Sequence, residues 1–335
     1  MTDWKFLNKE VKFNEEYLKG AEVHKKVRKD LNELLLTKKI LDMKYYDIAE
    51  IIEDLILKYT KENNLEKGIA FPIGLSVNEC AAHWTPNYGE QKKWKYNDLV
   101  KIDFGVHYNG CIIDSAFSTS FNRKYDELIS IGKEATNIGI KNSGIDCILG
   151  EIGKEVQEFI ESKEITIDNK IYPLKSIKDL TGHLIEPYII HGNKCIPNFN
   201  INYPIRMKEN EIYALETFPT TGNGRTCLDL DCSHYMLNSE KILKNPNLND
   251  DLFGKEKKLF NKVIEMRQTL PFCKKWLKKE NIKGYQIPLN SLVNKGLVKS
   301  YPPIISQKNT LVIQFEHTIH IKESGVNVLT RGDDY

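Results

Sequence analysis

Residues 101–117 read KIDFGVHYNGCIIDSAF, a run with a turn signal at its centre. The Asn109–Gly110 pair is typical of a two-residue hairpin loop, because both residue types tolerate the positive φ that a type I′ turn requires. The residues on either side are largely β-branched, aromatic or small, as expected for strands. The run therefore predicts a β-hairpin over about Asp98 to Phe121, with Tyr108 paired to Cys111 across the loop.

This register brings two acidic residues together. Asp103 falls opposite Ala116 and Asp114 falls opposite Gly105, so the two aspartates are diagonal neighbours on one face, roughly 7–8 Å apart at the backbone. Their flanks are apolar, and burial would raise the pKa of both carboxyls. A cation between them would remove both the repulsion and the cost of burial. The alternative is a hairpin whose two acids face water, and the hairpin alone does not decide between these readings.

Further acids stand in apolar runs elsewhere. Glu216 lies in IYALETF and Glu316 lies in LVIQFEHTI, and both runs read as strands, over about 211–218 and 310–321. A glutamate in a buried strand is rare unless it is paired or bound to a metal. His183 lies in LTGHLIEPYIIH, eight residues before His191. A structural salt bridge could explain any one acid, but it explains the set less well.

The full candidate set contains four carboxylates and one imidazole. Four negative charges balance two divalent cations, and ligands rich in oxygen with one histidine suit Mn, Fe, Co or Zn. Carboxylates can bridge two such ions roughly 3.5–4 Å apart, an arrangement that activates water for hydrolysis. The sequence thus predicts a two-metal hydrolase whose metal ligands are Asp103, Asp114, His183, Glu216 and Glu316.

Composition sets the broad class. The chain has 335 residues, of which 41% are hydrophobic and 28% are charged, and its net charge is +2. This balance argues against a nucleic-acid-binding surface that covers the whole protein. Seven cysteines without a CxxC pair indicate reduced thiols. No apolar run approaches the ~18 residues of a membrane span, and no signal peptide is evident. We therefore expect a cytoplasmic protein that binds neither membranes nor specific nucleic acids.

Helical and strand patterns alternate along the chain. Apolar spacing predicts a single α+β domain over residues 1–335, with a Lys/Asn-rich helical insertion at 233–300. The lysines on the first two helices are expected to form solvated faces rather than a nucleic-acid stripe. The predicted helices are 14–36, 46–59, 126–141 and 148–162.

Several segments together resemble the type 2 methionine aminopeptidases, whose fold is called pita-bread. The matching segments are AFPIGLSVNECAAHWTPN (70–87), VKIDFGVHYNGCIIDSAFS (100–118), LTGHLIEPYIIH (180–191), YALETFPTTGNG (213–224), CSHYM (232–236), QFEHTI (314–319) and RGDDY (331–335). They follow the family's order from Ala70 to Tyr335. The resemblance implies a pita-bread fold, in which the five candidate ligands hold two divalent ions (Co, Mn, Fe or Zn). It also implies that the insertion at 233–300 is a helical subdomain of the type 2 kind.

The resemblance assigns further site residues. It implies that His83 lies near the scissile nitrogen, that His191 contacts the substrate carbonyl, and that Glu216 carries a proton as well as binding metal. The positions that resemble the family's methionine pocket are Phe71, Ile190, His234 and Tyr301. For His24, His107 and His320, each taken alone, an ordinary structural role is expected.

The implied activity is removal of the initiator methionine from nascent proteins and peptides with a small second residue. Its partners would be nascent polypeptides with an N-terminal methionine, acted on by a monomer, with the ribosome as a further possible partner. Eukaryotic type 2 enzymes usually carry a long charged N-terminal extension, whereas about seventy residues without such runs precede the first matching segment here. Association with the ribosome by that route is therefore not expected.

Two alternative functions stay open. A proline-directed aminopeptidase or prolidase has a similar fold and ligand set, and a proliferation-associated binding homologue keeps the fold without catalysis. The short N-terminal region and the CAAHWTP and CSHYM segments favour methionine over proline, and the five intact ligand positions favour an enzyme over a binding protein. Leu184, Glu186 and Pro187 depart from the smaller residues expected beside the metal histidine, and the sequence does not show their effect.

Overall fold

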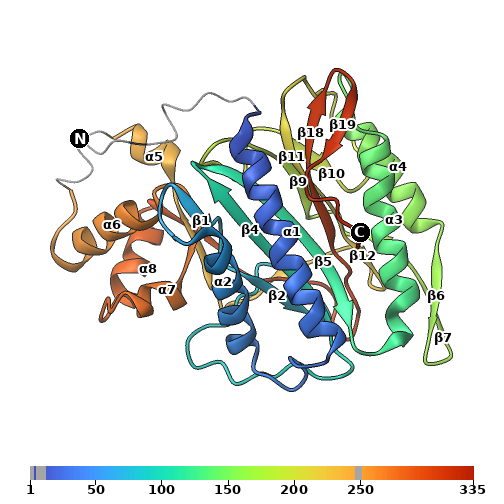
Figure 1. The fold of residues 1–335 in the computed structure, drawn as a ribbon, viewed down its shortest axis with the longest axis horizontal. Coiled ribbons are helices and arrows are strands. Elements are labelled where there is room, and N and C mark those ends of the chain that lie inside the picture. Colours follow the sequence, from blue (N-terminus) through green and yellow to red (C-terminus); the bar gives the residue numbers. More distant parts are fainter. Residues whose placement is uncertain (1–3, 5–12, 246–250) are drawn as a thin grey trace.

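The computed structural model describes residues 4, 13–245 and 251–335. Two antiparallel sheets form its centre, and pairs of helices cover them on the outside (Figure 1). Helices α1 (Glu15–Leu36) and α2 (Tyr45–Thr60) lie over the first sheet, and α3 (Asp126–Lys141) and α4 (Leu149–Glu161) lie over the second. All four helices match the sequence-based predictions to within one or two residues.

The predicted hairpin is confirmed with its register. Strands β4 (Leu99–Tyr108) and β5 (Cys111–Ser120) pair antiparallel, with Tyr108 opposite Cys111 at the loop. Asn109 and Gly110 both have positive φ, at 48° and 81°. Strands β1 (Lys67–Ile69) and β2 (Gly74–Val77) pair in tandem with the other edge of β4, which completes the first sheet.

Helix α1 packs directly on this hairpin. Asn14 caps it, since its side chain accepts a hydrogen bond from the Glu16 amide at 2.9 Å. Its buried stripe recurs at helical spacing, and Gly20 allows close approach, because a Cβ there would lie 2.9 Å from the Ile113 side chain. The helix thus holds the hairpin from the side opposite the acids.

The second sheet has five strands in the order β10-β9-β11-β18-β19. The strand predicted at 211–218 is present as β11. The strand predicted at 310–321 is only partly correct, because residues 310–314 are irregular. Their backbone amides bond to different segments, such as Val312 to Asn78 O at 3.1 Å and Ile313 to Pro219 O at 2.9 Å. The strands are β9 (Thr181–Ile185), β10 (Cys195–Pro197), β11 (Ile212–Thr217), β18 (Phe315–Lys322) and β19 (Gly325–Val328).

The two sheets meet where β5 runs beside β18, and side-chain hydroxyls cross this seam. Thr318 Oγ1 accepts from the Asp114 amide at 2.8 Å, and Ser115 Oγ donates to Glu316 O at 2.7 Å. Ser118 Oγ donates to Gln314 O at 2.9 Å. These bonds fix the strand that carries Asp114 against the strand that carries Glu316.

The described residues of the insertion, 233–245 and 251–300, gather at one side of the molecule, drawn in yellow to orange in Figure 1. The prediction of a helical segment holds for its helices α5 (Ser239–Leu243), α6 (Gly254–Arg267), α7 (Lys274–Lys279) and α8 (Gln286–Asn294). It missed three short strands, which form a small sheet in the order β15-β14-β16. They are β14 (His234–Leu237), β15 (Phe272–Cys273) and β16 (Val298–Tyr301).

The remaining elements are short. A 3₁₀ turn, η2 (Arg123–Tyr125), leads into α3, and the strands are β3 (Cys80–Ala82), β6 (Glu164–Ile167), β7 (Lys170–Pro173), β8 (Lys175–Ser176), β12 (Pro219–Thr220), β13 (Cys227–Leu228) and β17 (Ile304–Ile305). Among the residues described, no helix is long and apolar enough to cross a membrane.

Candidate metal centre and active site

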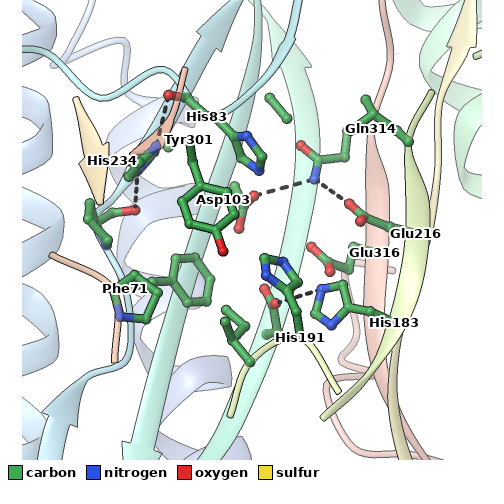
Figure 2. A pocket seen from close by; sticks show the side chains of 17 residues that line it. Phe71, His83, Asp103, His183, His191, Glu216, His234, Tyr301, Gln314 and Glu316 are labelled. Carbon is green, nitrogen blue, oxygen red and sulfur yellow. Dashed lines mark hydrogen bonds and ion pairs between the residues drawn. The ribbon is translucent and has the colours of Figure 1, made fainter. Parts of the chain in front are cut away.

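The five predicted metal ligands line one cavity between the sheets (Figure 2). The first sheet supplies two of them and the second sheet supplies three. His183 lies opposite Ala214 on the neighbouring strand, and Glu216 lies opposite Glu316. Strand pairing therefore brings together residues that are far apart in the sequence. They are Asp103 on β4, Asp114 on β5, His183 on β9, Glu216 on β11 and Glu316 on β18.

Three of these residues form a tight cluster. One ligand atom each from Asp114, His183 and Glu316 lies within 4.8 Å of the others, and all three residues are buried. His183 Nε2 lies 3.7 Å from Asp114 Oδ2. This spacing suits donor atoms that surround one small cation.

The other two carboxylates meet through Gln314, which the sequence reading did not single out. Its Nε2 donates to Glu216 Oε2 at 3.0 Å and lies 3.4 Å from Asp103 Oδ2 (Figure 2). Gln314 lies two residues before Glu316 and has a side chain in the same cavity. An amide at that spacing from a candidate ligand was the signal in the sequence that could have identified it.

Without a cation the electrostatics of this cavity are unfavourable. Burial raises the pKa of Asp103 to about 7, and burial together with the neighbouring carboxylates raises the pKa values of Asp114, Glu216 and Glu316 well above the ordinary range. Burial also lowers the pKa of His183 to about 4, which keeps its imidazole neutral and able to bind metal.

Several buried polar atoms of the set lack a partner. Asp103 Oδ1, His183 Nδ1 and Glu316 Oε2 have no hydrogen bond among the residues that the structure describes. Unsatisfied buried oxygens beside repelling carboxylates are what a divalent cation would neutralise. The donor set therefore fits metal ions bound mainly through oxygen.

His83 and His191 flank the ligands at the mouth of the cavity (Figure 2). The ring of His191 lies 4.5 Å from that of His183 and 5.8 Å from that of Tyr301, measured between centroids. His83 has a φ of 65°, an uncommon value for a residue with a side chain. His234 Nδ1 donates to His83 O at 2.8 Å, which helps hold this backbone in place.

An apolar slot forms one end of the cavity. The whole cavity, slot included, has a volume of about 80 Å³, several times the space that one water molecule needs. The ring of Phe71 packs on Gly105, where a Cβ would lie only 2.2 Å from Phe71 Cε1. Glycine is therefore required at position 105. The predicted pocket residues Phe71, Ile190, His234 and Tyr301 all line the slot, and so do Pro72 and Pro271.

A second cavity, of about 380 Å³, begins on the other side of the ligands. It shares His183, Glu216, His83 and His191 with the first, and it ends at the exposed residues Asp179 and Asn193. The cluster of acids thus lies between a slot with buried walls and a cavity open to solvent.

The turn after the metal histidine points its extra acid away from the site. Glu186 and Ile189 form an isolated bridge, and Glu186 faces a separate pocket beside Tyr17 and Glu211. Burial and Glu211 raise the pKa of Glu186. Glu186 therefore lines neither of the two cavities that contain the candidate ligands.

The three histidines expected to be structural lie outside both cavities. His24 Nε2 donates to Phe104 O at 3.1 Å, and its ring stacks on Phe104. His320 stacks on Phe13, and His107 is buried beside the hairpin loop.

Comparison with known proteins places these features in a family. The model of metallopeptidase family M24 matches residues 15–323. Methionine aminopeptidase 2-1 of Fusarium vanettenii is 42% identical over 329 residues, covering 96% of this chain and 72% of the relative. Methionine aminopeptidase 2 of Schizosaccharomyces pombe is 41% identical over 317 residues, covering 95% and 72%.

Solved structures show the same fold at low sequence identity. A methionine aminopeptidase from Thermotoga maritima superposes with a TM-score of 0.62 at 18% identity, covering 96% of this chain and 99% of that one. A thermophilic Arx1 gives a TM-score of 0.73 at 16% identity, covering 96% and 91%. Prolidase from Pyrococcus furiosus gives 0.53 at 15%, covering 96% and 65%. The expected pita-bread fold is confirmed.

Proposed function

The chain belongs to metallopeptidase family M24, and we propose that it is a methionyl aminopeptidase that removes the N-terminal methionine from peptides whose second residue is small. Curated relatives named methionine aminopeptidase 2 share about 40% identity with nearly the whole chain. The observation that carries the proposal is the position of the acid cluster between a closed apolar slot and an open cavity.

Two divalent cations, of Co, Mn, Fe or Zn, are the proposed cofactors. The residues that would hold them are Asp103, Asp114, His183, Glu216 and Glu316. Two divalent cations would neutralise the repulsion between these carboxylates and would bind their unpaired oxygens. When bound, such ions acidify water and polarise a carbonyl group.

The chain's own residues then handle the substrate and its protons. Glu216 is the proposed proton carrier, since its carboxylate lines the cavity beside the other candidate ligands and could accept a proton from water and return it to the leaving amine. His191 faces the shared part of the two cavities and would donate to the substrate carbonyl oxygen as negative charge develops there. His83, whose pKa burial lowers to about 4, offers a neutral imidazole near the scissile nitrogen.

The shape of the two cavities supports removal of a single residue. Phe71, Ile190 and His234 are at most 8% exposed and close the slot, so a side chain can enter but a polypeptide cannot pass. The rest of the substrate must leave through the second cavity, toward Asp179 and Asn193. An apolar slot lined by aromatic rings also suits the thioether of methionine.

We further propose that residues 1–335 act as one catalytic domain, with 233–300 as an insertion subdomain that contributes His234 and Pro271 to the slot, directly before Tyr301. Nascent polypeptides are the proposed natural substrates, with a monomer acting in the cytoplasm. Co-sedimentation with ribosomes, with and without nascent chains, tests whether the ribosome itself is a partner.

A peptide panel with metal-reconstituted protein tests the proposed function. Release of methionine from Met-Ala, with little cleavage of Ala-Pro peptides, is the expected result, and bound metal is measured on the same samples. Faster cleavage of Ala-Pro peptides would favour a proline-directed enzyme. Stoichiometric metal without cleavage of any peptide would favour a binding protein.

A further inference from the structure

The walls of the apolar slot are held from outside by residues 267–271, the short segment between α6 and β15. We infer that this segment positions the slot and sets its preference for a linear side chain over a branched one. The inference rests on the proposed function, because it concerns the side chain that the slot accepts.

The first contact is made by Arg267, whose side chain is buried. Its Nη2 donates to Ile69 O at 2.9 Å and to Ala70 O at 2.7 Å, and its Nε donates to Pro271 O at 3.1 Å. Ile69 and Ala70 come directly before Phe71 in the chain. The guanidinium therefore fixes the backbone from which the Phe71 ring enters the slot.

The second contact holds the backbone near Ile190, another residue of the slot. Thr269 Oγ1 donates to Tyr188 O at 2.6 Å, two residues before Ile190. Tyr188 has a φ of 63°, so this bond stabilises a backbone conformation that is uncommon for tyrosine. The hydroxyl of Tyr188 donates in turn to Leu65 O at 2.6 Å. Loss of the Thr269 hydroxyl would leave a carbonyl unpaired and free this turn to shift.

The third contact is Pro271 itself, which lines the slot. The segment is compact, because the Leu270 amide donates to Arg267 O at 2.9 Å. Just beyond it, Trp276 Nε1 donates to Glu53 Oε1 on α2 at 2.8 Å, and Arg267 lies over the Trp276 ring at 4.9 Å. Residues 267–271 thus contact the backbone just before Phe71 and just before Ile190, and they supply Pro271 to the slot. Arg267 and Thr269 do not line the slot themselves.

Thr269→Val provides the sharpest test, because it removes one hydroxyl and keeps the shape. Thr269→Ser keeps the hydroxyl and removes the methyl group. Thr60→Val is the matched control, since Thr60 is also a buried threonine that donates to carbonyls, Ile56 O at 3.0 Å and Glu62 O at 2.8 Å, but lies on α2. The measured quantity is the ratio of kcat/KM for Met-Ala to kcat/KM for Leu-Ala, with Tm recorded for each variant.

We expect Thr269→Val to lower this ratio at least about fivefold, since pocket shape discriminates such side chains by roughly 10–200-fold. Thr269→Ser and Thr60→Val should keep the wild-type ratio. Arg267→Lys retains the charge but replaces the rigid fork, whose Nε and Nη2 donate in different directions, by a single ammonium group, so it should lower the ratio as well and serves if Thr269→Val does not fold. An unchanged ratio in Thr269→Val, or an equal fall in Thr60→Val or Thr269→Ser, would overturn the inference.

Binding measurements separate this inference from the proposed function. Calorimetric titration with L-methionine and with L-leucine reports the slot directly and requires no turnover. Preference of the wild type for L-methionine, lost in Thr269→Val, would support the inference even if no peptide were cleaved. Normal cleavage of Met-Ala by a Thr269→Val variant that binds both amino acids as the wild type does would leave the proposed function standing and refute the positioning role.

Discussion

Glu216 and Glu316 lie directly opposite each other across the β11–β18 pair, and both carboxyl groups enter the same cavity. Like charges at directly opposed positions destabilise a sheet. The pairing of β11 with β18 therefore holds the carboxylates of Glu216 and Glu316 close enough to repel each other when both are ionised. The pKa values of both carboxyls are raised well above the ordinary range, with burial as the larger cause.

This repulsion predicts how the stability of the metal-free protein depends on pH. Because the folded-state pKa of Asp103 is raised to about 7 and those of Glu216 and Glu316 are raised well above their ordinary range, the folded protein binds protons more tightly than the unfolded chain, and its stability falls as pH rises above about 4. In chelator, we expect the wild-type Tm to be about 5–10 °C lower at pH 8 than at pH 5. Mn²⁺ or Co²⁺ should restore it at pH 8, and Glu216→Gln should flatten the slope. Parallel slopes for wild type and Glu216→Gln would contradict this.

Replacing Asp103 by asparagine should reduce metal affinity and activity together. The change keeps the size of the side chain but removes a charge that faces the cavity, so a loss of at least about 100-fold in activity is expected with the fold preserved. Glu216→Gln should cost more, since it removes a ligand and the proposed proton carrier. Metal titration and circular dichroism check this, with exposed Asp126→Asn as the control. Full activity in metal-loaded Asp103→Asn would remove Asp103 from the ligand set.

Gln314 should matter for activity although it is not a proposed ligand. Its amide links Glu216 to Asp103. Gln314→Met keeps the volume but frees both carboxylates, so we expect activity to fall roughly 10–100-fold while the protein still binds two equivalents of metal. Activity and metal content measured on one preparation decide the point. Loss of one full equivalent of metal would instead make Gln314 a ligand in its own right.

The closed slot should select methionine as the first residue of the peptide, and the space after the slot should restrict the second residue. Met-Gly, Met-Ala and Met-Ser peptides should be cut, and Met-Lys or Met-Trp should resist cleavage. Norleucine should be a poorer but real substitute for methionine, because an apolar pocket discriminates by only about 1–3 kcal/mol per methylene. Steady-state kinetics on this set checks the prediction, and equal rates for Met-Ala and Met-Trp would show that the space after the first residue is not restricted.

His83 should be the histidine that reacts with electrophiles in the site. Burial lowers the pKa of His83 to about 4, so its imidazole stays neutral and nucleophilic from pH 5 to pH 8. Burial keeps His183 and His191 neutral too, so the preference for His83 rests on its position: it is not a proposed metal ligand, and its ring lies beside the slot residues His234 and Tyr301. An epoxide with an apolar tail should therefore alkylate His83 at a rate that hardly changes over that range, and leave His183 and His191 unmodified. Peptide mass spectrometry locates the adduct. Labelling at His191 would mean that the roles of the two histidines have been exchanged.

The parts of the fold that could be predicted from the sequence depend on residues that are close together in the chain. Asn109–Gly110 set the hairpin register, and the register placed Asp103 and Asp114 on one face. Helical spacing gave α3 its bounds to the residue. The roles of His83 and the slot residues came from resemblance to a family, not from any local pattern.

Long-range packing explains what could not be predicted. The position of Gln314 two residues before Glu316 suggests that both side chains share a face, but its contacts with Asp103 and Glu216 form only when β18 meets β5 and β11. Residues 310–314 resemble a strand because Leu311, Val312 and Ile313 are apolar, yet the amides of Val312 and Ile313 bond to two separate segments. The contacts of Arg267 and Thr269 join the insertion to residues about 80 or about 200 positions away.

The boundary between β5 and β18 is bridged by side-chain hydroxyls, and bound metal ions would help hold the two sheets together there. In the described part of the chain, β5 has a main-chain ladder with β4 but none with β18. Asp114 and Glu316 stand on either side of that boundary, within 4.8 Å of each other at their ligand atoms. A cation bound by both residues would cross-link the two sheets, which the side-chain hydroxyl bonds of Ser115, Ser118 and Thr318 also join. Withdrawing the metal would thus loosen the joint as well as stop the chemistry, and apo and loaded protein would differ most in how fast the amides along this boundary exchange with solvent.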